Sequence, residues 1–168
     1  MTRDKDVFVT LGERPRIGNR AKADMFISIH ANSAVTNKLS GTEVFYFSKK
    51  SSPYAERIAA FENSVGDKYG EKSNNIVQIM GELAYKKNQE ISIGLARKIS
   101  ASISSGMAMK DRGIHGANFA VLRGFNGPGV LIELGFINNS SDIKKLVNPA
   151  NQKKMAQQIA KVVRANYY

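Results

Sequence analysis

Apolar residues recur along the chain with two different periods. Three short runs are almost continuously apolar, which is typical of buried strands: "DMFISIHA" (24–31), "GTEVFYFS" (41–48) and "VLIELGFI" (130–137). A fourth, shorter strand is expected in "NFAVLRG" (118–124), after a loop punctuated by glycines. The first two runs are separated only by a polar loop, so we expect them to be neighbours in one sheet.

Segments with helical periodicity fill the intervals between these strands. The first begins at Thr10, with Glu13 at the spacing of a capping box. The longest has apolar residues at intervals of three, four or eight, and it can be one helix or two. Because strands alternate with helices, the sequence predicts an α/β fold. The expected helices cover about 10–23, 53–63 and 74–104, a short turn after Ser141, and 148–168.

Composition limits the possible environments and partners of the chain. Its 168 residues are 42% hydrophobic, which is enough for one domain with a core. A net charge of +11 favours polyanionic surroundings such as nucleic acid, anionic lipid or an acidic cell-wall polymer, and charge alone does not choose among them. With no cysteine, the chain has neither disulfides nor thiolate metal ligands. No apolar run has the length of a membrane span, and the polar start "MTRDKDVFV" is unlike a signal peptide.

Two polar residues lie near the carboxyl ends of apolar strands, His30 and Glu133. Open α/β sheets usually place their ligand sites at this edge. A buried carboxylate needs a cation or a set of hydrogen bonds, and a metal site would meet that need. The alternative is a core histidine and a glutamate paired with one of the many lysines or arginines. Both interpretations stay open on this evidence, and Asn32 and Glu43 are expected nearby, at the mouth of a cleft.

Several segments occur in an order that resembles one known family. The chain resembles the zinc-dependent N-acetylmuramoyl-L-alanine amidases of the amidase-3 family over nearly its whole length. This resemblance implies a three-layer α/β sandwich with a mixed sheet. It also implies a periplasmic or extracellular hydrolase that cleaves peptidoglycan between the lactyl group of N-acetylmuramic acid and L-alanine. The segments are "MTRDKDVFVTLGER", "ADMFISIHAN", "GTEVFYFS", "NFAVLRG" and "PGVLIELGFINNSSD".

The resemblance also implies particular roles for the two polar residues. Family members hold one Zn²⁺ with two histidines and a glutamate, and a further glutamate acts as general acid and base. His30 matches the second histidine ligand, and Glu133 matches the catalytic glutamate. The family's first strand and helix, with the other two ligands, precede the "MTRD" motif. We therefore expect 1–168 to be one catalytic domain that is incomplete at its N-terminus and inactive or poorly folded by itself. His115, in a glycine-punctuated loop, is not expected to replace a ligand.

The segment from about residue 62 to 89 resembles a regulatory insertion of relatives that act in cell division. Glu71 and Glu82 could approach the metal from it, although a solvated helix face is the favoured explanation because exposed carboxylates are the usual case. An activator protein could act on this segment. Two other functions remain possible: an inactive module that binds the cell wall, and a basic nucleic-acid-binding protein. The second is disfavoured because no RNP, KH or zinc-finger pattern occurs.

Overall fold

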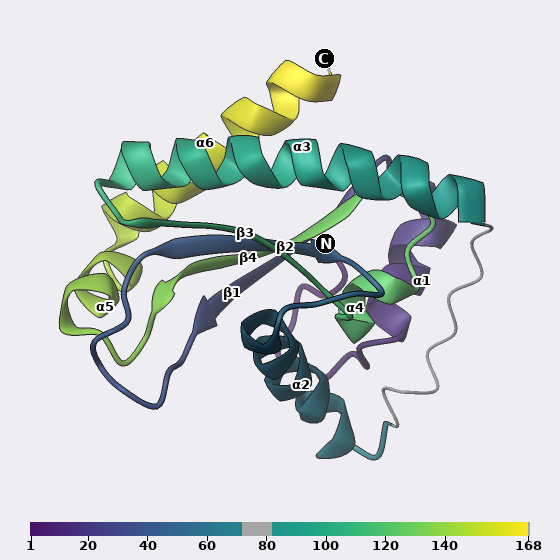
Figure 1. Ribbon diagram of the computed structural model, residues 1–168, viewed down its shortest axis with the longest axis horizontal. Helices are drawn as coiled ribbons and strands as arrows, with labels where there is room; N and C mark the ends of the chain where they lie inside the picture. Colours follow the sequence, from purple (N-terminus) through teal and green to yellow (C-terminus); the bar gives the residue numbers. More distant parts are fainter. Residues whose placement is uncertain (72–81, 168) are drawn as a thin grey trace. The chain divides into compact units, whose positions relative to one another are not determined.

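A computed structural model describes residues 1–71 and 82–167, without the side chains of Asp67 and Glu82. Within these described ranges, four strands form one sheet in the order β1-β4-β2-β3, and six helices accompany them (Figure 1). The α/β prediction is confirmed. The strands are β1 (Phe26–Asn32), β2 (Thr42–Phe47), β3 (Asp111–Ala117) and β4 (Gly129–Phe136). The helices are α1 (Glu13–Arg20), α2 (Pro53–Asp67), α3 (Glu82–Met107), α4 (Ala120–Arg123), α5 (Ser140–Leu146) and α6 (Pro149–Tyr167).

The sheet is mixed, as backbone hydrogen bonds at the strand ends show. Strands β1 and β4 are parallel, because bonds join their starts (Phe26 N to Pro128 O) and their ends (Ile137 N to Asn32 O). Bonds at both ends also make β2 and β3 parallel, joining Thr42 to Lys110 and Ser48 to Ala117. The first two predicted strands, β1 and β2, therefore share a sheet but are separated by β4.

The two central strands, β4 and β2, run in opposite directions, and a buried aspartate joins their adjacent ends. Asp142 Oδ2 accepts hydrogen bonds from Gly41 N (2.8 Å) and Phe136 N (3.0 Å). The start of β2 thus lies beside the end of β4, which makes these two strands antiparallel. Asp142 is only 3% exposed, so these two backbone N–H groups take the place of the water molecules that would otherwise hydrogen-bond to its carboxylate.

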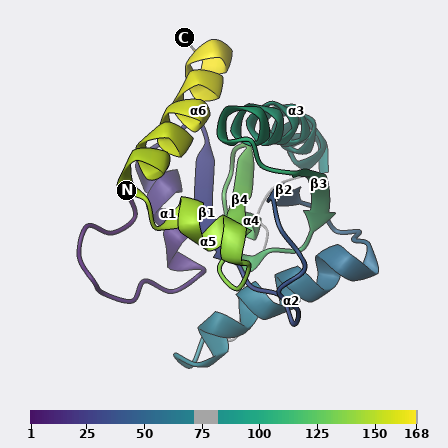
Figure 2. The same cartoon turned by 90° about the vertical axis from the view of Figure 1, so that its left-hand side faces the viewer.

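The chain divides into two compact units, which are described separately. The first comprises Met1–Ser28, Tyr46–Ser92 and His115–Val130; in it α4 contacts both α1 and α2 (Figure 1). The second comprises Ile29–Phe45, Ile93–Ile114 and Leu131–Tyr168; in it α5 contacts α6 (Figure 2). No helix in the described ranges is long and apolar enough to cross a bilayer.

Two predicted elements are wrong, and the reasons are physical. Residues 118–124 were expected to form a strand, but Ala120–Arg123 form the one-turn helix α4. Its apolar residues are buried on every side, and a short run of that kind has no period that distinguishes helix from strand. The loop expected around Gly113 is instead strand β3 at an edge of the sheet. Gly113 has a φ of +85°, a conformation that costs glycine little.

Helices α2 and α3 lie where the sequence predicts helices. Helix α2 begins where expected, with Ser52 Oγ accepting the N–H of Ala55 at 3.2 Å, and it continues past residue 63 to Asp67. The predicted helix 74–104 corresponds to α3 from Glu82 onward, and its first part lies outside the described residues. Only half of the capping box at Thr10 forms: Glu13 N donates to Thr10 Oγ1, whereas the Glu13 carboxylate pairs with Arg20.

Candidate functional site

His30 and Glu133 lie on neighbouring parallel strands, β1 and β4, within the second unit. A ring nitrogen of His30 and a carboxylate oxygen of Glu133 lie within 4.8 Å of each other. Glu133 is fully buried, and His30 is half-buried. An imidazole nitrogen is a ligand that zinc binds, and a carboxylate close to it can act as a base toward a water in the same site, so the pair fits part of a catalytic zinc site. A catalytic zinc ordinarily has three protein ligands, and of this pair only His30 is assigned as one.

The sequence offers two other glutamates, Glu71 and Glu82, that could approach the metal. Both carboxylate oxygens of Glu71 accept backbone N–H groups at the start of α1, from Leu11 (2.6 Å) and Gly12 (2.8 Å). A negative charge there also suits the helix dipole. The side chain of Glu82 lies outside what the structure describes. Glu62 is a half-buried carboxylate of α2 in the first unit, with chemistry suited to a metal, and no pattern in the sequence distinguishes it from other surface glutamates.

The second histidine of the chain belongs to a strand and not to a loop. His115 lies in β3, is half-buried, and has its ring centroid 5.4 Å from that of Tyr54 in an edge arrangement. The two rings belong to the first unit, whereas His30 belongs to the second.

A buried polar network links three strands of the second unit. Asn32 Nδ2 on β1 donates to Glu43 Oε1 on β2 at 2.7 Å. Arg112 Nε on β3 donates to Glu43 Oε2 at 3.2 Å, and its guanidinium carbon lies 5.2 Å from the centroid of the Phe136 ring. Since β4 separates β1 from β2, the Asn32–Glu43 bond connects the two neighbours of the strand that carries Glu133.

This network changes the interpretation of two residues expected at a cleft mouth. Glu43 is 0% exposed and Asn32 is 4% exposed, so both lie in the interior. Their burial follows from pairing, because a carboxylate without a cation would be very unfavourable there. Arg112 was missed. The signal for it was a glutamate within the apolar strand "GTEVFYF", which requires a cation from elsewhere in the chain.

Two arginines of the first unit have shifted acidities without a role in the site. Burial lowers the pKa of Arg123, and burial followed by repulsion from Arg3 lowers the pKa of Arg14. Guanidinium groups nevertheless keep their charge at neutral pH. Arg3 pairs with Asp6 at 3.9 Å at the surface.

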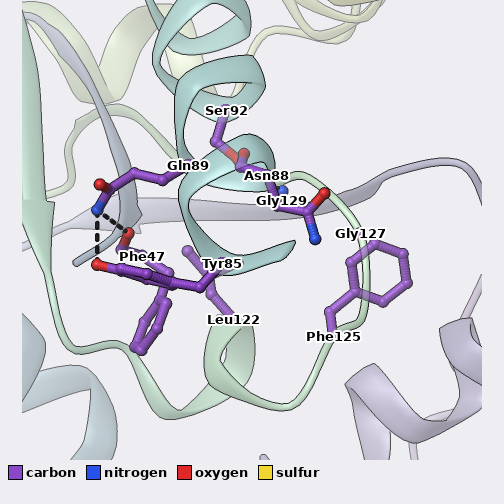
Figure 3. Close-up of a pocket in the computed structure, with 9 residues that line it drawn as sticks. All are labelled: Phe47, Tyr85, Asn88, Gln89, Ser92, Leu122, Phe125, Gly127 and Gly129. Atoms are coloured by element: carbon purple, nitrogen blue, oxygen red, sulfur yellow. Dashed lines mark hydrogen bonds between the residues drawn. The ribbon is translucent and has the colours of Figure 1, made fainter. Parts of the chain in front are cut away.

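The first unit contains a small cavity between α3 and the turn before β4 (Figure 3). Gln89 Nε2 donates to Phe47 O (3.1 Å) and to Tyr85 Oη (2.8 Å), and Ser92 Oγ accepts the N–H of Gly129 (3.0 Å). Its volume of about 20 Å³ has room for one water molecule but not for a sugar or a peptide. The cavity is therefore a structural feature and not a substrate site.

Comparison with known proteins assigns the fold to a class and the chain to a family. The mixed α/β sheet flanked by helices is that of cell-wall amidase structures. The chain belongs to the N-acetylmuramoyl-L-alanine amidase family, whose profile matches residues 1–165.

Individual relatives agree with the family assignment. The chain is 30% identical to the N-acetylmuramoyl-L-alanine amidase AmiA of Escherichia coli (strain K12), over 97% of this chain and 58% of that protein. A crystal structure of an N-acetylmuramoyl-L-alanine amidase from Clostridium difficile 630 matches with a TM-score of 0.70 at 27% identity, over 97% of this chain and 68% of that one. The catalytic domain of the amidase CwlV from Bacillus (Paenibacillus) polymyxa var. colistinus matches with a TM-score of 0.68 at 25% identity. The match covers 98% of this chain and 69% of that one. The chain spans 40% to 62% of the length of the first five curated relatives.

Proposed function

We propose that the whole protein hydrolyses peptidoglycan at the amide between the lactyl group of N-acetylmuramic acid and L-alanine. The observation that carries the proposal is the closeness of His30 and Glu133, within 4.8 Å, in a chain of the amidase family. We further propose that the protein acts in the periplasm or outside the cell, because its polymeric substrate lies there.

In this mechanism, each of the two residues has a distinct task. A ring nitrogen of His30 would be one ligand of the zinc ion. Zinc, when bound, polarises the scissile carbonyl and lowers the pKa of water to about 7. Glu133 accepts a proton from the attacking water and delivers it to the departing alanine nitrogen. Its complete burial excludes bulk water from the carboxylate, which strengthens its electrostatic interactions with the reacting groups.

The two histidines provide a matched test of the proposed ligand. His30→Ala should reduce zinc affinity by about 100-fold or more, since losing even an outer partner of a ligand costs about 10- to 100-fold. Zinc is measured by mass spectrometry after dialysis of the whole protein that the gene encodes, and hydrolysis is followed with dye-labelled peptidoglycan. His115→Ala should keep both zinc and activity. Equal zinc contents in the two variants would refute the assignment, and a wild type that pellets with peptidoglycan without cutting it would favour a wall-binding module.

We also propose that the segment 62–89 regulates the enzyme and that an activator protein acts on it. The support is its resemblance to the insertion of division amidases; along the chain it includes the end of α2, the connection to α3 and the start of α3. A Gly/Ser linker of equal length in place of residues 72–81 leaves both helices intact. This variant should hydrolyse peptidoglycan faster than wild type in the absence of an activator. An unchanged basal rate would rule out inhibition by these residues.

A further inference from the structure

A groove runs between α3 and α6 in the second unit, two helices that lie side by side in Figure 2. Its volume is about 440 Å³, which is within the range of ligand-binding clefts. Lysine ammonium groups, hydroxyls and amides supply its polar lining. The polar lining residues are Lys98, Ser102, Ser105, Gln158, Lys161 and Asn166.

The walls of this groove are held in place by bonds between the two helices. Ser102 Oγ donates to Gln158 Oε1 at 2.9 Å, and Lys98 Nζ donates to Asn166 Oδ1. A Cβ atom added at Gly106 would lie 2.6 Å from Gln158 Cδ, so the backbone of α3 approaches α6 closely at this point. The groove is therefore a fixed feature of the packed helices.

The charged residues on the two helices that form the groove are all positive in this region. Neither α6 nor the portion of α3 from residue 91 to 107 contains an aspartate or glutamate, and together they carry six lysines and arginines. Most acidic residues of the second unit lie inside it: Glu43, Glu133 and Asp142 are at most 3% exposed. The fourth, Asp111, accepts a hydrogen bond from Ser100 Oγ at 2.6 Å. The six cations are Arg97, Lys98, Lys153, Lys154, Lys161 and Arg164.

We propose that this groove is a second binding site for intact peptidoglycan and that it takes the carboxylate-bearing stem peptides. Lys98 and Lys161 would pair with peptide carboxylates. The hydroxyl hydrogen of Ser105 donates to Ala101 O at 2.7 Å, so its oxygen is suited to accept a peptide N–H, while the amide nitrogen of Gln158 can donate to a peptide carbonyl. A polymer of phosphate groups alone has no N–H to donate, so this pair of groups favours a peptide. Because peptidoglycan repeats its carboxylates, such a site would raise the avidity of the enzyme for the wall. The inference rests on the proposed function only in taking peptidoglycan as the polymer.

The test compares two double variants with the same charge change on the whole protein. Both are made in a Glu133→Gln background, so that the polymer is not cut during sedimentation with peptidoglycan sacculi stripped of secondary polymers. Lys98→Gln with Lys161→Gln should weaken binding about five- to tenfold, as expected for the loss of two exposed ion pairs. The control is Lys153→Gln with Lys154→Gln, two exposed lysines of α6 outside the groove lining, which should change binding less than about twofold.

Every other outcome overturns the inference. Equal losses in the two double variants would mean that general charge, and not the groove, attracts the wall. Binding only to sacculi that keep their phosphate polymers, or equally strong binding to DNA, would identify a different polyanion. With Glu133 intact, the groove variant should cleave a small soluble muropeptide at the wild-type rate. Failure of the proposed function would appear separately, as a wild type without amidase activity.

Discussion

Replacing Glu133 by glutamine is expected to slow amide hydrolysis by the whole protein about 10²- to 10⁴-fold, the usual contribution of a general acid–base group. Glutamine has nearly the same shape but cannot accept the proton of the attacking water. The residue is 0% exposed, so bulk water cannot easily replace the lost base. The initial rate of release of the stem peptide from a soluble muropeptide measures the effect.

The control is Glu90→Gln, which makes the same chemical change at an exposed position of α3. It should leave the rate within about twofold of wild type, as is usual for a surface substitution. Thermal unfolding of both variants shows whether the chain stays folded. A Glu133→Gln protein that is folded and cleaves at the wild-type rate would exclude Glu133 as the proton acceptor.

Replacing Arg112 by leucine is expected to lower the free energy of unfolding by about 3–5 kcal/mol, because it leaves one partner of a buried ion pair uncompensated. The Glu43 carboxylate is 0% exposed, and the Arg112 side chain is 16% exposed, so water screens this pair weakly. Asn32 would remain as a donor to Glu43, but an amide brings no charge. Urea unfolding followed by circular dichroism measures the change.

Two further proteins make the result specific to the ion pair. Arg97→Leu removes the same charge from an exposed position of α3 and should cost less than about 0.5 kcal/mol. The double variant Glu43→Leu with Arg112→Leu should recover part of the loss, because no buried charge is then left alone. Equal destabilisation by Arg112→Leu and Arg97→Leu would show that the pair adds nothing to stability.

Local pattern was sufficient for the elements with a clear period or a clear cap. The strands around His30, Val44 and Glu133 could be predicted because their apolar residues are almost continuous, as buried strands require. The start of α2 could be predicted because Ser52 and Pro53 are a cap and a first-turn residue. Helix α4 and strand β3 could not be predicted, since burial on all sides and an edge position remove the periodic signal.

The candidate site divides in the same way. The sequence by itself determined which residues have the right chemistry, His30 and Glu133 on apolar strands, and their roles remain a prediction. Only the tertiary structure decided that parallel pairing of β1 and β4 brings a ring nitrogen of His30 and a carboxylate oxygen of Glu133 within 4.8 Å. It also decided that Arg112 compensates Glu43 across 69 positions of sequence. Chemistry is a property of single residues, whereas pairing over such separations depends on strand order, which no local pattern contains.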